Sequence, residues 1–486
     1  MSSLERSTLG DGLSISRLVT GLWQVADLEK DGRTLEPKAA AQSLAAYARE
    51  GFDTFDMADH YGSAEVITGE LGALAARGGA PSFRAFTKWC PEPAAMTPEA
   101  VRGGVDRALV RMRTDAVDLM QFHWWIYEDP RYLDALHELA VLKRAGLIRN
   151  LGLTNFNADH LRLVLADGVP VVSNQVCLSL LDRRALGEMS TVCRETGVRL
   201  LAYGTLCGGF LSERYLGAPE PASIPDWSRM KYKRFIDAAG GWGVLQRILE
   251  AANTVAKKHG VSIANVATRW VLDQPAVAAV IVGARLMEAE HRGDNARVFA
   301  LRLDAGDHAL LDAAMAHATP IPGDCGDEYR KPPYLTASGD LSHHLASFPK
   351  VYEPQPVEGR RQRQRIDSGS IWESVCGFSR AVRDGNRIFV SGTTATHPGG
   401  RGIAPNDPGA QAVYVLDKIS AALQSLGGAL DDVVRTRIYV RDASLWEPVS
   451  RVHGRYFSTV RPANTLVEAK LVGDYLVEIE AEAVID

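Results

Sequence analysis

Short apolar segments alternate with amphipathic segments along roughly the first 300 residues of the chain. The apolar segments are typical of β-strands buried on both faces. They are Leu18–Trp23, Phe52–Ala58, Phe83–Lys88, Val117–His123, Arg149–Thr154, Val171–Val176, Arg199–Gly204 and Ala279–Gly283. The helical stretches between them include Pro37–Glu50, Pro98–Met112, Pro130–Ala145 and Arg183–Thr196. This alternation predicts an α/β fold with a parallel sheet covered by helices.

The number of strands decides between two α/β architectures. Eight strands over about 300 residues are what a closed (β/α)8 TIM barrel requires. An open doubly wound sheet is the competing architecture, but no Gly-x-Gly-x-x-Gly motif follows the first strand. We therefore predict a barrel over residues 1–317.

The segment 318–365 is rich in proline and ends in a run of arginines. Dense prolines suppress regular structure, so we interpret it as a linker that packs on the barrel surface. The run Arg360–Arg365 holds four arginines, a small electrostatic footprint. We therefore favour a solvated linker or an interface to the next domain over a nucleic-acid site.

The pattern changes again after residue 366. The strands expected there are Asn386–Thr393, Asp432–Arg441 and Tyr475–Ile485, and the helices are Pro408–Gly427 and Leu445–Val460. Long strands with two helices, without regular alternation, predict a small α+β domain over residues 366–486. In its last strand, Glu478, Glu480 and Glu482 share one face, which fits either a solvent-exposed face or an interface or cleft.

Composition narrows the function classes. The net charge of −5 gives no global attraction to nucleic acid or anionic membranes. No apolar run reaches the roughly 18–20 residues of a membrane span, and the first residues lack the apolar core of a secretory signal. The six cysteines are spread out without a Cys-x-x-Cys pair, which predicts reduced thiols and no metal site. We expect a cytoplasmic protein.

Three proton-handling side chains, Asp56, Lys88 and His123, lie at or near the ends of successive predicted strands. A fourth, Tyr61, follows Asp56 by five residues. Barrel enzymes of this type gather such residues at the carboxyl-terminal rim. A phenol titrates near pKa ~10, and a close ammonium such as Lys88 lowers that value by stabilising the phenolate. Asp56 supplies the counter-charge that a buried lysine needs.

His123 is expected to donate a hydrogen bond to a substrate oxygen and so to orient the substrate. The four residues together form a proton relay suited to reducing a carbonyl or oxidising an alcohol. No side chain supplies a hydride, so a cofactor is required. The competing interpretation is an inert Asp56–Lys88 salt bridge with Tyr61 packed nearby. We favour the relay because all four residues lie in or just after consecutive strands.

Residues 8–315 resemble the aldo-keto reductase family. The motifs that carry the resemblance are FDTFDMADHYGSAE (52–65), TKW (87–89), VDLMQFHW (117–124) and GLIRNLGLTNF (146–156). The resemblance implies that Asp56, Tyr61, Lys88 and His123 are the catalytic tetrad, with Tyr61 as general acid. It also implies that Thr154, Asn155 and Gln175 hold the nicotinamide carboxamide and that Tyr203 stacks on the nicotinamide ring.

The adenosine end of the cofactor is expected near Gly283, Arg285 and Asn295. Glycine lets the backbone approach a phosphate, and arginine offers a planar fork for the 2′-phosphate of NADP. The position where many members of the family carry a second basic residue is His291, which is often neutral at pH 7. We therefore favour NADP and keep NAD as the alternative.

Aromatic residues near the rim strands suggest the wall of a substrate pocket. We assign Trp23, Trp89 and Trp124 to that wall, with Trp125 and Tyr127 nearby. Such a wall suits a ring, a sugar face or an aliphatic aldehyde equally well. The substrate is thus a small carbonyl or alcohol compound whose identity stays open.

Residues 366–486 resemble the Rid family of enamine/imine deaminases, which have a chorismate-mutase-like fold and assemble as trimers with clefts between subunits. The carrying motifs are FVSG (389–392), ALDDVVR (429–435), TRIYV (436–440), RPANTLVE (461–468) and VEIE (477–480). Glu478 matches the cleft carboxylate of the family. Asn464 stands where deaminases carry a carboxylate-binding arginine, and an amide lacks the charged bidentate contact. Arg461 lies three residues earlier and is a weak substitute.

These observations leave three functions open. The first is an NADP-dependent carbonyl reductase or alcohol dehydrogenase whose Rid-like domain binds a small ligand or drives homo-oligomerisation, for which the Rid resemblance implies a trimer. The second is a bifunctional enzyme whose C-terminal domain hydrolyses an imine; Asn464 argues against it. The third is a non-enzymatic cofactor-sensing protein; the intact tetrad argues against it.

Overall fold

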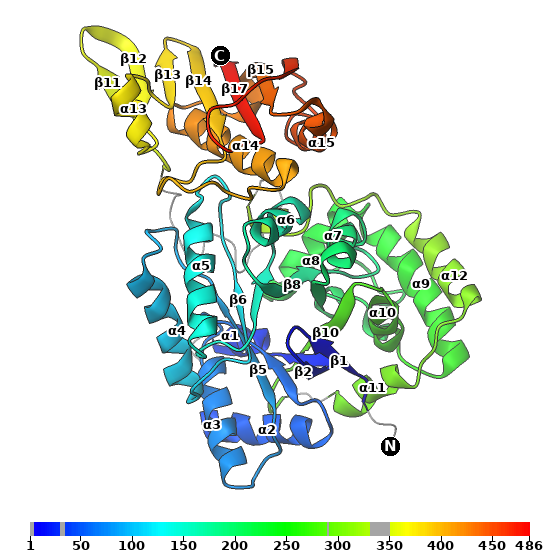
Figure 1. Cartoon of the computed structure of the whole chain (residues 1–486). Coiled ribbons are helices and arrows are strands. Elements are labelled where there is room, and N and C mark those ends of the chain that lie inside the picture. Colours follow the sequence, from blue (N-terminus) through cyan, green and yellow to red (C-terminus); the bar gives the residue numbers. More distant parts are fainter. Residues whose placement is uncertain (1–3, 30–34, 289–290, 331–349) are drawn as a thin grey trace.

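The computed structural model describes residues 4–29, 35–288, 291–330 and 350–486. A closed eight-stranded barrel forms the N-terminal part, and a seven-stranded sheet forms the C-terminal part (Figure 1). The predicted TIM barrel followed by an α+β domain is therefore confirmed. Within the described residues no helix is both long enough and apolar enough to cross a membrane.

The barrel strands are those that the apolar segments predicted. All are parallel, in the closed order β10-β3-β4-β5-β6-β7-β8-β9. Their bounds are β3 (Leu18–Gly21), β4 (Thr54–Asp56), β5 (Arg84–Trp89), β6 (Leu119–Phe122), β7 (Leu151–Thr154), β8 (Val171–Cys177), β9 (Arg199–Tyr203) and β10 (Val277–Gly283). The residues of β3, β4, β6 and β7 are buried throughout, because side chains fill the barrel and helices cover its outside.

Helices connect the strands and surround the barrel. They are α1 (Trp23–Glu29), α2 (Pro37–Arg49), α3 (Ala64–Ala76), α4 (Pro98–Met112), α5 (Arg131–Arg144), α6 (Ala158–Ala166), α7 (Glu188–Thr196), α8 (Trp227–Ala238), α9 (Trp242–His259), α10 (Ile263–Leu272), α11 (Arg292–Ala296) and α12 (Ala305–Met315). Side-chain caps fix several starts: the Thr97 hydroxyl accepts from the amide of Ala100 at the start of α4. The stretch predicted as one helix, Arg183–Thr196, is a 3-10 turn followed by α7, separated at Gly187.

A two-stranded hairpin that the sequence did not predict precedes the barrel. It pairs β1 (Arg6–Leu9) with β2 (Leu13–Ser16) in antiparallel register. Leu9 and Ile15 are fully buried in a small core with Phe86 and Leu201 from the barrel strands. The hairpin thus adds apolar packing to residues at the centre of the barrel.

The C-terminal domain consists of one mixed sheet and three helices. Its strands are β11 (Gln355–Val357), β12 (Arg360–Ile366), β13 (Ala381–Asp384), β14 (Arg387–Thr394), β15 (Val433–Val440), β16 (Ala463–Glu468) and β17 (Val477–Val484). They follow the order β11-β12-β13-β14-β17-β15-β16. The helices are α13 (Ile371–Cys376), α14 (Pro408–Ser425) and α15 (Trp446–Tyr456).

The arginine run differs from the expected linker. Residues 360–366 form strand β12, which pairs with β13 through backbone hydrogen bonds. Most side chains of β12 are exposed. The strand is therefore held by backbone hydrogen bonds, and it has no apolar face by which the sequence would predict it. Residues 331–349 of the expected linker lie outside the described residues.

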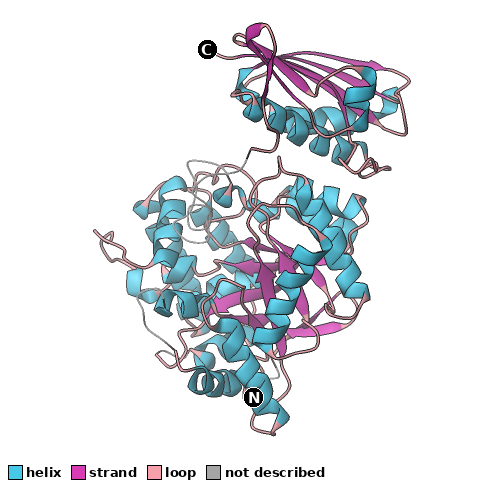
Figure 2. Ribbon diagram, turned by 90° about the vertical axis from the view of Figure 1, so that its left-hand side faces the viewer, coloured by secondary structure: helices cyan, strands magenta, loops and turns pink. Residues whose placement is uncertain are grey.

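The C-terminal domain packs on the barrel through its helices. Figure 2 shows the helices of this domain between its sheet and the barrel. The main contact joins α14 to α6. Arg401 makes two hydrogen bonds to the Asp167 carboxylate, and Arg455 pairs with Asp159. The other face of the sheet points away from the barrel.

Candidate active site

A cavity of about 600 Å³ opens at the carboxyl ends of the barrel strands. The four proposed catalytic residues line it: Asp56, Tyr61, Lys88 and His123. All seven proposed cofactor residues line it as well, namely Thr154, Asn155, Gln175, Tyr203, Gly283, Arg285 and Asn295. These eleven residues lie on six barrel strands or in segments that follow barrel strands, and the parallel topology brings them into one space.

Lys88 and Asp56 form a buried ion pair at the base of this cavity. The Lys88 Nζ donates to Asp56 Oδ2 over 2.5 Å and to the Met57 carbonyl over 3.0 Å. Asp56 Oδ1 accepts from the amides of Gln121 and Gln175, each over 2.8 Å. Both charges are thus satisfied by fixed partners, as burial of an ion pair requires.

Tyr61 lies beside this pair, but its pKa moves against our expectation. The Lys88 Nζ lies 4.8 Å from the centre of the Tyr61 ring. Burial, and then the Asp56 carboxylate, raise the pKa of Tyr61 well above its ordinary value. Asp56 neutralises Lys88 at close range, so the ammonium does not stabilise the phenolate as predicted. Tyr61 is therefore a protonated phenol at neutral pH.

The His123 imidazole, directly after β6, lines the same cavity. Its Nδ1 lies 3.3 Å from the carbonyl oxygen of Thr154. Trp125 packs edge-on against the ring, with centres 4.3 Å apart, and Tyr329 does so at 5.6 Å. These contacts fix the plane of the imidazole next to the cavity.

Asn155 and Tyr203, proposed to contact the nicotinamide, are joined to each other. The Tyr203 hydroxyl donates to Asn155 Oδ1 over 2.8 Å. The Asn155 backbone amide donates to the Gln175 carbonyl over 2.8 Å. Asn155 has a φ of +60°, an uncommon conformation for a residue other than glycine.

The proposed adenosine-binding residues line the same cavity. A Cβ on Gly283 would lie 2.3 Å from Gln24 Oε1, so a larger residue there would displace the Gln24 side chain. The guanidinium of Arg285 donates to Asp226 over 2.7 Å, and Glu288 lies 3.8 Å away. His291 and Asn295 also line the cavity. The residues present thus fit a dinucleotide, since Tyr203 and Arg285 line one cavity.

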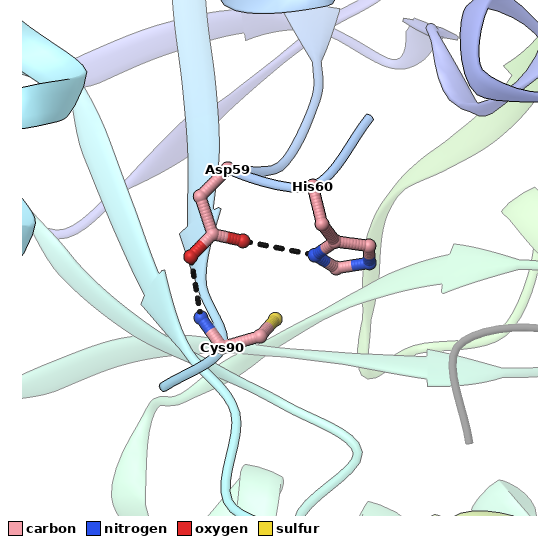
Figure 3. Close-up of side chains that lie close together, drawn as sticks. All are labelled: Asp59, His60 and Cys90. Atoms are coloured by element: carbon pink, nitrogen blue, oxygen red, sulfur yellow. Dashed lines mark hydrogen bonds and ion pairs between the residues drawn. The ribbon is translucent and has the colours of Figure 1, made fainter. Parts of the chain in front are cut away.

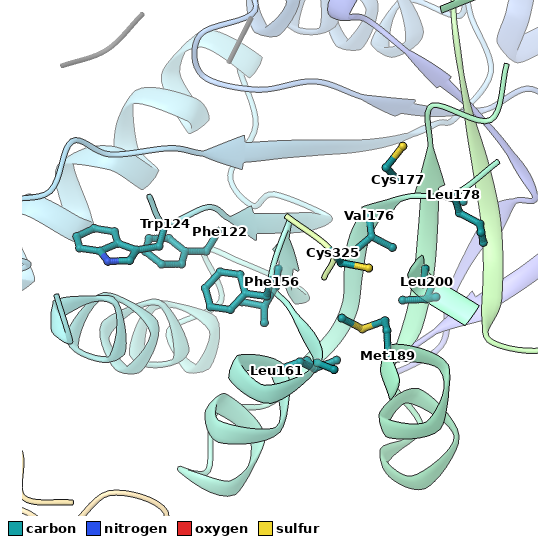
Figure 4. Packing of buried hydrophobic residues seen from close by; sticks show 14 of the residues in the cluster. Phe122, Trp124, Phe156, Leu161, Val176, Cys177, Leu178, Met189, Leu200 and Cys325 are labelled. Atoms are coloured by element: carbon teal, nitrogen blue, oxygen red, sulfur yellow. The ribbon is translucent and has the colours of Figure 1, made fainter. Parts of the chain in front are cut away.

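The aromatic wall is only partly where we expected it. Trp23 lines the cavity and packs edge-on against Tyr61. Trp89 and Trp124 do not line it: Trp89 packs against Gly104 of α4, and Trp124 stacks on Phe122 in the hydrophobic core (Figure 4). Both side chains point outward to the helices, where burial of an indole is favourable. Trp125 lines the cavity instead.

The segment 321–330, which follows the last barrel helix, adds residues that sequence reasoning missed. Tyr329 lines the cavity with Lys231 of α8, whose Nζ contacts the Tyr329 hydroxyl. Glu328 is fully buried and pairs with Arg184 over 3.0 Å. Burial alone would raise the pKa of Glu328, but Arg184 and then Lys231 lower it below its usual value. No apolar pattern marks this charged segment as buried.

Asp59, His60 and Cys90 lie close together (Figure 3), and His60 and Cys90 line the cavity. Their donor atoms are within 4.8 Å of one another, and these residue types bind zinc in other proteins. Both carboxylate oxygens of Asp59 already have partners: Oδ1 meets His60 Nδ1 at 2.9 Å, and Oδ2 accepts from the Cys90 amide at 3.1 Å. These bonds give the group a role in ordering the turn before Tyr61.

The two proposed Rid cleft residues lie apart within the sheet. In register, Asn464 of β16 pairs with Thr436, and Glu478 of β17 pairs with Tyr439. The Asn464 amide donates to the Thr436 hydroxyl over 3.1 Å and lies 3.3 Å from His453 Nε2. Burial raises the pKa of the Glu478 carboxyl.

The six cysteines are all free thiols, as predicted. Five of them are buried or half-buried inside the barrel part, and Cys376 is exposed on α13. This arrangement leaves the fold dependent on packing and not on disulfides.

Comparison with known proteins agrees with both resemblances. The family model described as "Aldo/keto reductase family" matches residues 17–316, and that described as "Endoribonuclease L-PSP" matches residues 370–485. The chain is 34% identical over 216 residues to flagellar radial spoke protein 5 of Chlamydomonas reinhardtii, a stretch that covers 40% of each protein. It is 35% identical over 107 residues to a RutC family protein of Pyrococcus abyssi, covering 22% of this chain and 84% of that protein.

A solved structure resembles the barrel part. The glycerol dehydrogenase of Gluconobacter oxydans is 25% identical and superposes with a TM-score of 0.55, covering 67% of this chain and 98% of that one. The chain spans less than half the length of the radial spoke protein that it matches. Because the first family model covers more than half of the chain, this protein belongs to the aldo/keto reductase family and carries a Rid-type domain at its C-terminal end.

Proposed function

We propose that the barrel reduces a small aldehyde or ketone, or oxidises the corresponding alcohol, with NADP as hydride carrier. The observation that supports this most is the shared cavity, which brings Tyr61, Lys88, His123 and the residues proposed for the cofactor into one space. NADP supplies the hydride when it is bound. The protein supplies the proton, the orientation of the substrate and the exclusion of water.

Each member of the tetrad has a separate role in this proposal. Tyr61, kept protonated by burial, gives its proton to the carbonyl oxygen during reduction. Lys88, held by its ion pair with Asp56, lies over the Tyr61 ring and orients the phenol. His123 orients the substrate oxygen. Trp23, Trp125 and Tyr329 line the side of the cavity next to these groups and are proposed to contact the substrate.

We favour NADP over NAD because the Arg285 guanidinium lines the cavity. The Arg285 guanidinium already donates to the Asp226 carboxylate, so a bound 2′-phosphate would share the guanidinium with that carboxylate. NAD therefore stays the alternative cofactor.

For the C-terminal domain we propose assembly or small-ligand binding in place of imine hydrolysis. Asn464 is engaged with Thr436 and carries no charge for a substrate carboxylate. Phe389 and Val434, 40% and 46% exposed, lie on sheet strands that a partner subunit would cover. The Rid resemblance suggests a homotrimer. Release of ammonia from 2-aminoacrylate would instead support the bifunctional alternative.

The test of the barrel activity is NADPH and NADH oxidation against a panel of aldehydes and ketones. Wild type is expected to turn over at least one carbonyl, and Tyr61→Phe is expected to lose the reaction while it still binds cofactor. If wild type neither reduces a carbonyl nor oxidises an alcohol, the non-enzymatic alternative replaces this proposal.

A further inference from the structure

The turn after β7 connects the proposed nicotinamide site to the C-terminal domain. It begins at Asn155, whose side chain accepts a hydrogen bond from Tyr203, and reaches α6 through Asn157. The Asn157 side chain caps α6 by accepting from the amide of His160. Contacts that hold α6 and this turn in place therefore also constrain the position of Asn155.

The carbonyl of Asn155 is held tightly from the barrel side. Arg330 donates to it over 2.5 Å, and the Tyr127 hydroxyl lies 3.4 Å away. A Cβ on Gly326 would lie 2.0 Å from this oxygen, so the segment 321–330 packs directly on it. The Tyr127 hydroxyl also accepts from the amide of Asn157 over 3.1 Å. Tyr127 thus contacts the turn at both of its ends.

His160 holds the ring of Tyr127 in place. The two rings stack with centres 3.4 Å apart and planes 8° from parallel. His160 is 2% exposed, and its Nδ1 lies 2.7 Å from Asn157 Oδ1. Its other nitrogen, Nε2, lies 2.8 Å from Asp417 Oδ2.

Asp417 belongs to α14 of the C-terminal domain, far from His160 in the sequence. It is 6% exposed, and its second oxygen accepts from the Tyr456 hydroxyl over 2.6 Å. A buried polar group that loses its partner costs more than the bond itself contributes, so this contact strongly constrains the His160 ring. The fused domain thus supplies a contact in the barrel next to the cofactor residues.

We propose that Asp417 and His160 are positioning residues for the nicotinamide end of the cofactor site, acting through Tyr127 on Asn155. This inference rests on the proposed function, since it takes Asn155 as a contact of the nicotinamide. It gives the fused domain a role in the barrel reaction: its docking sets the geometry in which Asn155 and Tyr203 meet the cofactor.

The test measures binding of two ligands to the full-length chain by calorimetry. One is NADP, and the other is 2′-phospho-ADP-ribose, which has the same adenosine end but lacks the nicotinamide. The variants are Asp417→Asn and His160→Phe. Asp159→Asn is the matched control. Asp159 lies on α6 beside His160, and its replacement breaks a different contact between the domains, the ion pair with Arg455.

Asp417→Asn and His160→Phe are each expected to weaken NADP binding about three- to tenfold and to leave the fragment unaffected, a coupling of ordinary size. Their double variant is expected to be no worse than either alone, since both break one path. Asp159→Asn is expected to bind both ligands like wild type. Unchanged NADP affinity, or equal loss for both ligands, would overturn the inference. Wild type that binds neither ligand would overturn the cofactor site, and this inference with it.

Discussion

The Lys88 ammonium lies 2.5 Å from an oxygen of Asp56 and 4.8 Å from the centre of the Tyr61 ring. The Lys88 and Asp56 charges therefore neutralise each other beside the phenol. Burial and the Asp56 carboxylate raise the pKa of Tyr61, so the phenol carries its proton throughout the neutral range. This relationship favours reduction, which consumes that proton, over oxidation, which requires a base.

The pH dependence of the two directions follows from it. The kcat/KM for carbonyl reduction is expected to stay flat from about pH 6 to about pH 9, because Tyr61 remains protonated. Alcohol oxidation is expected to rise across the same range. Steady-state assays in both directions provide the measurement. A reduction rate that falls tenfold or more by about pH 8 would contradict the protonated phenol.

Arg285→Ala tests the preference for NADP. Loss of a charged hydrogen bond to the 2′-phosphate is expected to raise the KM for NADPH about tenfold, a value discounted because Arg285 is partly exposed and already bound to Asp226. The KM for NADH is expected to stay unchanged. Arg297→Ala, at an exposed arginine outside the cavity, is the control. Equal changes for both cofactors would show that Arg285 does not bind the 2′-phosphate.

Glu328→Gln tests the buried charges next to the cavity. The change leaves the Arg184 guanidinium with Asp182 as its remaining carboxylate partner, and removal of one member of a buried pair costs about 3–5 kcal/mol. A clear fall in the melting temperature is expected. Glu447→Gln breaks an exposed pair with Arg451 and is expected to leave the melting temperature nearly unchanged. Similar melting temperatures for both variants would contradict the role given to Glu328.

Lys418 makes the stability of the C-terminal domain depend on pH. Burial, with a contribution from Arg380, lowers the pKa of Lys418 from 10.5 to about 7. Between these values the unfolded chain binds the proton and the folded chain does not. Stability therefore rises with pH, by up to about 1.4 kcal/mol per pH unit from this group. Other groups titrate in the same range, so the comparison with Lys418→Met isolates this one.

Melting temperatures of wild type and Lys418→Met are to be compared from about pH 7 to about pH 8.5. The melting temperature of wild type is expected to rise relative to that of the variant as the pH rises. A constant difference between the two would mean that Lys418 is charged in the folded protein.

Much of the barrel could be predicted because its strands are buried on both faces and so appear as continuous apolar runs. The positions of Asp56, Lys88 and His123 at one rim could also be predicted, because parallel strands end on the same side of the barrel. The direction in which each tryptophan points could not be predicted. Trp89 and Trp124 are equally well buried outside the cavity, and hydrophobicity does not distinguish the two positions.

The remaining differences arise where polar residues are ordered by specific partners. Strand β12 is held by its backbone ladder, and its arginines give no alternating pattern. Glu328 is buried because Arg184 pairs with it, a contact between residues far apart in the sequence. The raised pKa of Tyr61 results from burial and then from the nearby Asp56 carboxylate, and the spacing of these residues in the sequence gives neither.

Transfer of deuterium from NADPH labelled at carbon 4 of the nicotinamide tests the central claim most directly. With one of the two stereospecifically labelled cofactors, wild type is expected to place one deuterium on the carbonyl carbon of the product alcohol, detected by mass spectrometry. Tyr61→Phe is expected to give no labelled alcohol while it still binds the cofactor. A product without label from either cofactor, under conditions in which wild type forms the alcohol, would contradict hydride transfer in this cavity.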